Sequence, residues 1–105
     1  MEHSYQILQL KEEKRNLLFN RYEEVKETFD LSNYNVVYEG KILSTDDVKP
    51  MTILEHLFHR FNAQRPSDFK GHSLSISDVI LLDGECYYCD TFGWQYIVMT
   101  KVESK

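Results

Sequence analysis

Two cysteines with the spacing of a redox or metal centre are the first residues that could perform chemistry. They lie in Cys86-Tyr87-Tyr88-Cys89 and are the only cysteines in the chain. A redox pair of this type has its first cysteine at a helix N-terminus, where the helix dipole lowers the thiol pKa. The two tyrosines favour a strand instead, and positions three apart on a strand point to opposite faces. We therefore expect two partly buried thiols and no zinc site, because zinc would need two further ligands.

A segment rich in serine and histidine is the second candidate. Residues 71–75 (GHSLS) match part of the G-x-S-x-G turn of serine hydrolases, but Ser75 stands where that turn needs its last glycine. A hydrolase using His72 with Ser73 or Ser75 and Asp78 would require the histidine within hydrogen-bond reach of a hydroxyl. Neighbours on an extended strand project away from each other, so the simpler interpretation is a set of short polar groups that fix a loop. We expect no catalytic residues and no enzymatic activity.

His56 and His59, with Glu55 beside them, form the third candidate. They fall on the polar side of a predicted helix, but the HExxH spacing of zinc proteases is absent. Exposed histidines on a solvated face explain the pattern without a metal. The four glycines are scattered singly, so no phosphate-binding loop is present either. The sequence therefore predicts neither a metal nor a cofactor.

Charge limits the partners that the chain can have. Its 105 residues include 17 acidic and 12 basic side chains, a formal net charge of −5. Binding to nucleic-acid phosphates requires a basic face, whereas the one basic cluster (Lys11, Lys14 and Arg15) is interrupted by Glu12 and Glu13. Nucleic acid is therefore a disfavoured partner, although not an excluded one.

Length and composition predict one domain over residues 1–105. The chain is 42% hydrophobic and 13% aromatic, which is globular composition, and the aromatic rings can fill a small core. No stretch approaches the ~20 apolar residues of a membrane span, and no basic-then-apolar leader follows Met1. We expect a cytoplasmic protein without a membrane partner.

Hydrophobic periodicity indicates two strands and two helices before Pro66. The strands cover residues 4–10 and 34–42. A polar turn and a helix over about 20–29, with Asn20 and Glu23 at capping spacing, lie between them. The second helix is expected to begin at the capping pair Thr52 and Glu55 and to end before Pro66. Its apolar arc consists of Ile53, Leu54, Leu57, Phe58 and Phe61.

The C-terminal third has the pattern of an antiparallel meander. Residues 73–77 alternate serine with Leu74 and Ile76, and a buried strand follows over 79–82. Asp83-Gly84 favours a two-residue hairpin turn into a strand over 85–90. Phe92-Gly93 should allow a bulge before a last strand over 94–100, and residues 101–105 should be a frayed tail. The result is an α+β domain with five to six strands and two helices packed on the sheet.

Three segments together resemble the YodL-like family. They are Leu57 to Asn62 (LFHRFN), Pro66 to Ile80 (PSDFKGHSLSISDVI) and Tyr88 to Trp94 (YCDTFGW). The family pattern is RFN, then P-x-DF-x-GHSLS and SDV, then YY-x-D-S/T and a hydrophobic-Gly-aromatic end. Trp94 stands where Phe is more usual, and the Asp83-Gly84 turn is tighter than in many relatives. The resemblance implies a domain carried by phages, conjugative elements and related bacterial elements, without an established activity.

The family pattern groups a set of residues into one architectural or binding unit, with Gly93 among them. The predicted binding residues are Asp68, His72, Ser75, Ser77, Asp78, Asp90 and Trp94. The leading hypothesis is a non-catalytic interaction domain of a mobile element or phage that binds a host or element protein. One alternative is a small β-barrel-like module that reads nucleic acid or nucleotides, stacking bases on exposed C-terminal rings. The candidate rings are Tyr87, Tyr88, Phe92, Trp94 and Tyr96. The hydrolase built on His72 is the second alternative.

Overall fold

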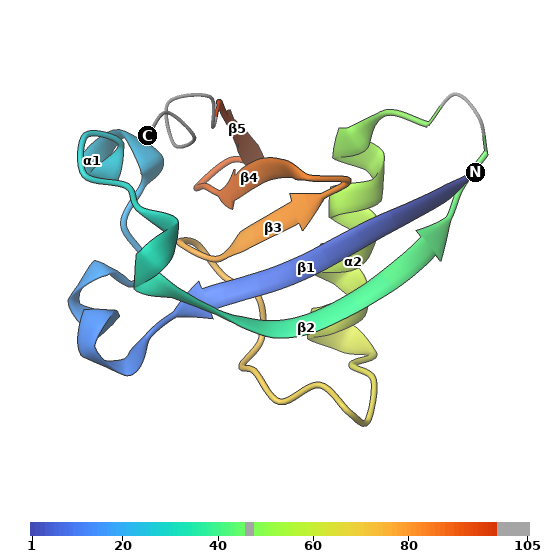
Figure 1. The fold of residues 1–105 in the computed structure, drawn as a ribbon, viewed down its shortest axis with the longest axis horizontal. Helices are drawn as coiled ribbons and strands as arrows, with labels where there is room; N and C mark the ends of the chain where they lie inside the picture. The colour runs from blue at the N-terminus through green and yellow to red at the C-terminus, as the bar shows by residue number, and fades with distance from the viewer. Residues whose placement is uncertain (46–47, 99–105) are drawn as a thin grey trace.

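A five-stranded antiparallel sheet forms the centre of the computed structural model, which describes residues 1–45 and 48–98 (Figure 1). Its strands in chain order are β1 (Glu2–Leu10), β2 (Tyr34–Leu43), β3 (Val79–Leu82), β4 (Glu85–Cys89) and β5 (Trp94–Ile97). In space the order is β2-β1-β3-β4-β5, so the first strand lies inside the sheet and β2 and β5 are its edges. The predicted α+β class is confirmed.

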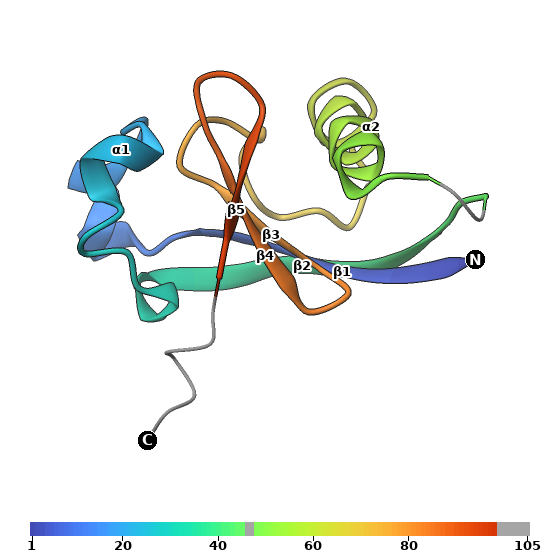
Figure 2. The same ribbon diagram turned by 90° about the horizontal axis from the view of Figure 1, so that it is seen from above.

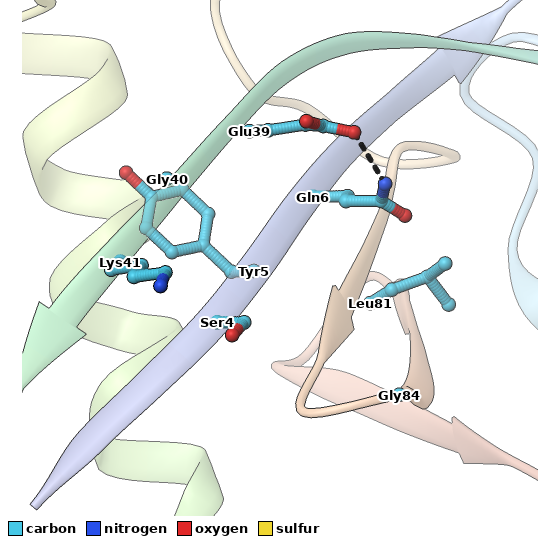
Figure 3. Close-up of a pocket in the computed structure, with 8 residues that line it drawn as sticks. All are labelled: Ser4, Tyr5, Gln6, Glu39, Gly40, Lys41, Leu81 and Gly84. Carbon is cyan, nitrogen blue, oxygen red and sulfur yellow. Dashed lines mark hydrogen bonds between the residues drawn. The ribbon is translucent and has the colours of Figure 1, made fainter.

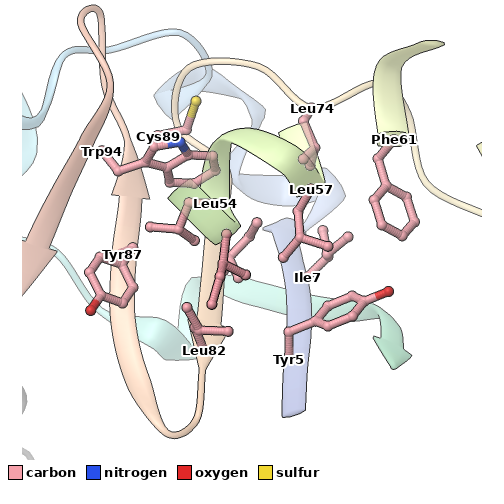
Figure 4. Packing of buried hydrophobic residues seen from close by; sticks show 12 residues of the cluster. Tyr5, Ile7, Leu54, Leu57, Phe61, Leu74, Leu82, Tyr87, Cys89 and Trp94 are labelled. Carbon is pink, nitrogen blue, oxygen red and sulfur yellow. The ribbon is translucent and has the colours of Figure 1, made fainter. Parts of the chain in front are cut away.

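Helix α2 (Pro50–Ala63) covers one face of the sheet (Figure 2). Four residues of the predicted apolar arc are buried and Phe58 is partly buried, so the periodicity identified this face correctly. They pack against strand residues that include Tyr5, Ile7, Leu82, Tyr87 and Trp94 (Figure 4). The helix begins two residues before the predicted Thr52, without a side-chain cap, because Pro50 already has the backbone angle of a first helical position.

The segment between β1 and β2 packs on the other face of the sheet. It contains the 3₁₀ helices η1 (Glu12–Leu17) and η2 (Leu31–Asn33) and the single-turn helix α1 (Tyr22–Val25). The predicted helix over 20–29 is therefore too long. Its first turn begins later than predicted because the Arg21 N–H bonds to the Glu24 carboxylate at 2.8 Å. Beyond Val25, packing of the Phe29 ring against Tyr22 and Tyr88 fixes the chain in place of helical bonds.

The C-terminal meander follows the prediction at its turn but not before it. Asp83 and Gly84 have φ of 51° and 84°, which confirms the two-residue hairpin. Residues 73–77, predicted as a serine-faced strand, form a loop in which Ser77 has φ of 96°. The last strand is described as far as Ile97; residues 99–100 of its predicted span and the 101–105 tail lie outside the described residues. Within residues 1–45 and 48–98, no helix has the length and apolar character needed to span a bilayer.

Candidate functional site

The buried side chain of Gln9 fastens the loop that carries the family pattern. Its Nε2 donates to Asp78 Oδ2 at 3.1 Å and to the His72 carbonyl at 2.9 Å. Its Oε1 accepts the His72 backbone N–H at 3.1 Å. Asp78 Oδ2 also accepts the Ser75 N–H at 2.9 Å. One glutamine at the end of β1 and one aspartate at the start of β3 therefore fix both ends of this loop.

Asp78 is fully buried, and burial raises its pKa to about 7. The Ser75 N–H, His72 and Gln9 act in the opposite direction, since each stabilises the carboxylate. Among the described residues, Asp78 Oδ1 and the hydroxyls of Ser75 and Ser77 are buried without a hydrogen-bond partner. Asp78 can therefore hold a proton near neutral pH, although its charge faces the interior of the protein.

Two further side chains hold the same loop. Asn62 on α2 donates to the Leu74 carbonyl at 3.2 Å and accepts the Leu74 N–H at 2.6 Å. The Tyr34 hydroxyl on β2 donates to the Ser77 carbonyl at 2.7 Å. Because β1, β2 and α2 all contribute, the asparagine of the RFN segment and the GHSLS and SD segments form one structural unit. Their polar atoms bind backbone groups of the loop.

His72 does not meet a serine hydroxyl. Its ring is exposed, with Nδ1 2.8 Å from the Ser73 carbonyl and 3.3 Å from Gln9 Nε2. Asp78 Oδ2 accepts its hydrogen bonds from Gln9 Nε2 and the Ser75 N–H. In the described part of the chain, no hydrogen bond connects the His72 ring to Ser73 Oγ or Ser75 Oγ. The geometric requirement of the alternative hydrolase, a His72 ring bonded to a serine hydroxyl, is not met here.

The remaining predicted site residues lie apart from the Gln9 network. Asp68 is exposed in the loop after α2. Asp90 follows β4 and accepts the N–H groups of Tyr22 at 3.1 Å and Thr91 at 2.8 Å. Trp94 is buried, with its ring edge-to-face against Phe58 at 6.2 Å. The loop brings His72, Ser75, Ser77 and Asp78 together. Asp90 and Trp94 share a groove with Ser75, whereas Asp68 lies apart.

The cysteines face opposite sides of the sheet, as predicted. Cys86 belongs to the core beneath α1, and Cys89 belongs to the core beneath α2. Burial raises the pKa of each thiol to about 12. Within the described residues, no three His, Cys, Asp or Glu side chains are grouped as a metal would require, and His56 and His59 are exposed.

A groove of about 380 Å³ lies beside the loop, between α2 and the turn after β4. Its floor includes Phe58, Leu74, Ile76 and Trp94, and its carboxylates are Glu55 and Asp90. Phe19, which is 63% exposed, lines it, and Phe92, 94% exposed, lies in the adjoining turn. Sequence reasoning missed Phe19, although a phenylalanine beside a polar segment was a usable signal for an exposed ring.

A histidine clamp at the other end of the sheet was also missed. His3 Nδ1 lies 2.6 Å from Asp83 Oδ2, and His3 Nε2 lies 2.7 Å from Ser44 Oγ. The order Ser-His-Asp matches a catalytic triad, but the Ser44 hydroxyl donates to the Thr45 carbonyl at 3.1 Å. The His3 ring joins β1, the end of β2 and the hairpin turn. His3 is the main cause that lowers the pKa of Asp83.

A second cavity, of about 490 Å³, lies on the sheet face opposite α2 (Figure 3). Ser4 and Gln6 of β1 and Glu39 and Lys41 of β2 line it, and Gln6 Nε2 donates to Glu39 Oε2 at 2.6 Å. Tyr5 and Leu81 add apolar surface to its lining. This part of the sheet is not covered by α1 or α2 in either ribbon view.

Comparison with known proteins identifies one family. The sequence model of the YodL-like domain matches residues 4–99, which is most of the chain. No curated protein and no solved structure shows significant similarity to this chain. The match begins inside β1 and continues past β5, so it includes every helix of the described chain and the other four strands of the sheet.

Proposed function

Since this chain belongs to the YodL-like family, we propose that it is a non-catalytic interaction domain that binds a protein partner. The partner is a protein of the bacterial host or of the mobile element or phage that carries the domain. This genetic context rests on the family resemblance. The binding surface that we assign is the groove beside the GHSLS loop, together with Phe19 and Phe92.

The exposure of two phenylalanine rings beside an apolar groove carries the proposal. Aromatic side chains are the residues most enriched at the centres of protein interfaces, and each buries a large area on binding. Phe92 is 94% exposed at the tip of the turn, where packing within the domain does not explain it. The groove floor adjoining that turn is apolar, so a partner side chain can leave water there.

Charge at the groove defines the partner further. Glu55 and Asp90 are the charged residues that line it, and both are acidic. A segment with an aromatic or aliphatic anchor next to a lysine or arginine complements this arrangement. We assign such a segment as the ligand of the groove.

Binding without catalysis agrees with how the loop uses its polar groups. Backbone groups of the loop are hydrogen-bonded to the side chains of Gln9, Asn62 and Tyr34. The Asp78 carboxylate accepts bonds from Gln9 and from a backbone N–H. A nucleophile and a base would need free, mutually bonded side chains. The Ser-His-Asp clamp at His3 has its hydroxyl proton directed to a carbonyl instead.

Nucleic-acid binding is the weaker alternative. Three of the five candidate rings, Tyr87, Tyr88 and Trp94, are buried, which leaves Phe92 and Tyr96 for stacking. Tyr96 donates its hydroxyl to Glu85 at 2.6 Å, so a carboxylate lies beside that ring. Carboxylates beside the stacking positions would repel phosphates.

Site-specific photo-crosslinking tests the assignment. A benzophenone amino acid at Phe92 should crosslink, in bacterial lysate, to a peptide with a basic residue beside an aromatic or aliphatic one. Glu55→Lys should abolish the crosslink, whereas Val36→Ala, at an exposed apolar position on β2, should leave it unchanged. Crosslinks only to acidic or purely polar peptides, or an unchanged yield with Glu55→Lys, would refute the groove as the binding site.

A further inference from the structure

The outer edge of β2 carries unpaired backbone groups. Among the described residues this strand pairs with β1 alone, and beyond that ladder no described backbone hydrogen bond reaches residues 35–43. Met1 and Ser44 exchange two bonds, from the Ser44 N–H to the Met1 carbonyl at 2.8 Å and from the Met1 amine to the Ser44 carbonyl at 2.7 Å. Bonded and non-bonded pairs alternate along an antiparallel ladder. The N–H and C=O groups of Glu39, Lys41 and Leu43 therefore point away from β1.

Opposite charges flank Gly40 on this edge. Glu39 and Lys41 are exposed and lie on the sheet face opposite α2 (Figure 3). When a second β2 strand runs antiparallel with Gly40 opposite Gly40, each Glu39 lies opposite Lys41 of the other copy. These two positions also carry the outward-facing backbone groups. One register thus satisfies the charges and the backbone hydrogen bonds together.

One apolar pair of the strand fits the same register. Tyr38 lies opposite Ile42 of the second copy on the face of α2, where both side chains are half-buried in the single chain. The register ends there, because Val37 is the extra residue of the bulge in β2 and packs in the core beneath α2. Pairing therefore rests on the stretch from Tyr38 to Ile42.

We propose that two copies of this chain associate through their β2 strands in this register and form one continuous antiparallel sheet. The two-fold axis passes by Gly40. The groove beside the GHSLS loop adjoins β5, at the opposite end of the strand order, so it stays open in the pair. Self-association through β2 is therefore independent of partner binding at that groove.

Sedimentation equilibrium over a wide protein concentration range tests the pairing. The unmodified chain should show a monomer–dimer equilibrium. Lys41→Glu places two glutamates opposite each other at both pairs beside the axis, and Glu39→Lys places two lysines there. Each variant should weaken the dimer by on the order of tenfold or more, because like charges directly opposite are destabilising. An equimolar mixture of the two variants should form a heterodimer, since its charges are complementary again.

The mixture separates a loss of pairing from a loss of folding, because misfolded variants would not combine. Lys70→Glu, a charge reversal at an exposed position in the loop after α2, should leave the dimer constant unchanged. A chain that stays monomeric at ~1 mM, where even weak specific pairs form, would overturn the proposal. So would a dimer that neither charge reversal weakens, because it would then form through another surface.

Discussion

Replacing Asp78 by asparagine is expected to remove a pH dependence from the stability of this fold. In the folded protein, burial raises the pKa of Asp78 from an ordinary 3.8 to about 7. An asparagine oxygen can accept the same two bonds, from the Ser75 N–H and from Gln9 Nε2. Its amide group would replace Asp78 Oδ1, which has no partner among the described residues. The variant keeps the network and loses the titrating proton.

The sign and size follow from proton linkage. Between pH 3.8 and about 7 the folded state binds more protons at Asp78 than the unfolded state does, so stability falls as the pH rises. The stabilisation is complete below pH 3.8 and is lost as the pH passes through the folded pKa. The pKa difference corresponds to no more than about 4 kcal/mol at neutral pH. Asp78→Asn should match the unmodified protein at about pH 4 and exceed its stability at about pH 8.

Urea unfolding from about pH 4 to about pH 8 measures this difference. Subtracting the two curves cancels the titrating groups that do not interact with Asp78, including Asp30 and Asp83, whose lowered pKa values act in the acid range in both proteins. Ser67→Ala, at an exposed position in the loop after α2, serves as the control and should give a curve parallel to that of the unmodified protein. Parallel curves for Asp78→Asn as well would refute the assignment of a proton-holding, buried Asp78.

Three further outcomes are expected. Asn62→Ala leaves the Leu74 N–H and carbonyl without their partner and should cost about 1–3 kcal/mol in urea unfolding, whereas the exposed His59→Ala should stay within about 0.5 kcal/mol. His3→Ala removes the main cause of the lowered Asp83 pKa. Because that carboxylate is half exposed, the free energy of unfolding should fall by under about 1 kcal/mol at pH 7, and this loss should shrink as the pH falls through the acid range. An equal loss of stability at about pH 3 would contradict the ion pair. Cys86 and Cys89, with pKa values raised to about 12, should react with a thiol reagent at about pH 8 only in urea; rapid reaction of the native protein would contradict their burial.

Local sequence signals predicted those parts of the fold that local interactions determine. The apolar arc of α2 is read from side chains one turn apart, and the Asp83-Gly84 hairpin needs only two residues with positive φ. The divergence of Cys86 and Cys89 follows from strand geometry alone. In each case the residues that decide the structure are close together in the chain.

Residues 73–77 show where such reasoning fails. Their alternation fits a strand, but the Asn62 side chain occupies the Leu74 N–H and carbonyl and the Tyr34 hydroxyl bonds to the Ser77 carbonyl. Gln9, 63 positions before His72, holds the backbone of the residue that precedes this segment. A strand ladder cannot form while those side chains occupy the backbone groups. The His3 clamp was missed for the same reason, because His3 and Asp83 lie 80 positions apart. A glutamine inside the apolar run of β1 was the available signal for the buried network.

The position of β1 inside the sheet, between β2 and β3, also governs the order in which the chain can fold. One edge of β1 pairs with β2, but the other waits for β3, and the Ser4 N–H reaches an Asp83 oxygen 79 positions later. Bringing residues so far apart in the chain together costs loop-closure entropy before the new contacts form, and this cost slows folding. During synthesis Ile7 and Leu8 therefore stay without their partners Ile80 and Val79 until almost the whole domain has left the ribosome. We expect completion of the core to be a late event in folding, with the half-made sheet as the stage most exposed to aggregation.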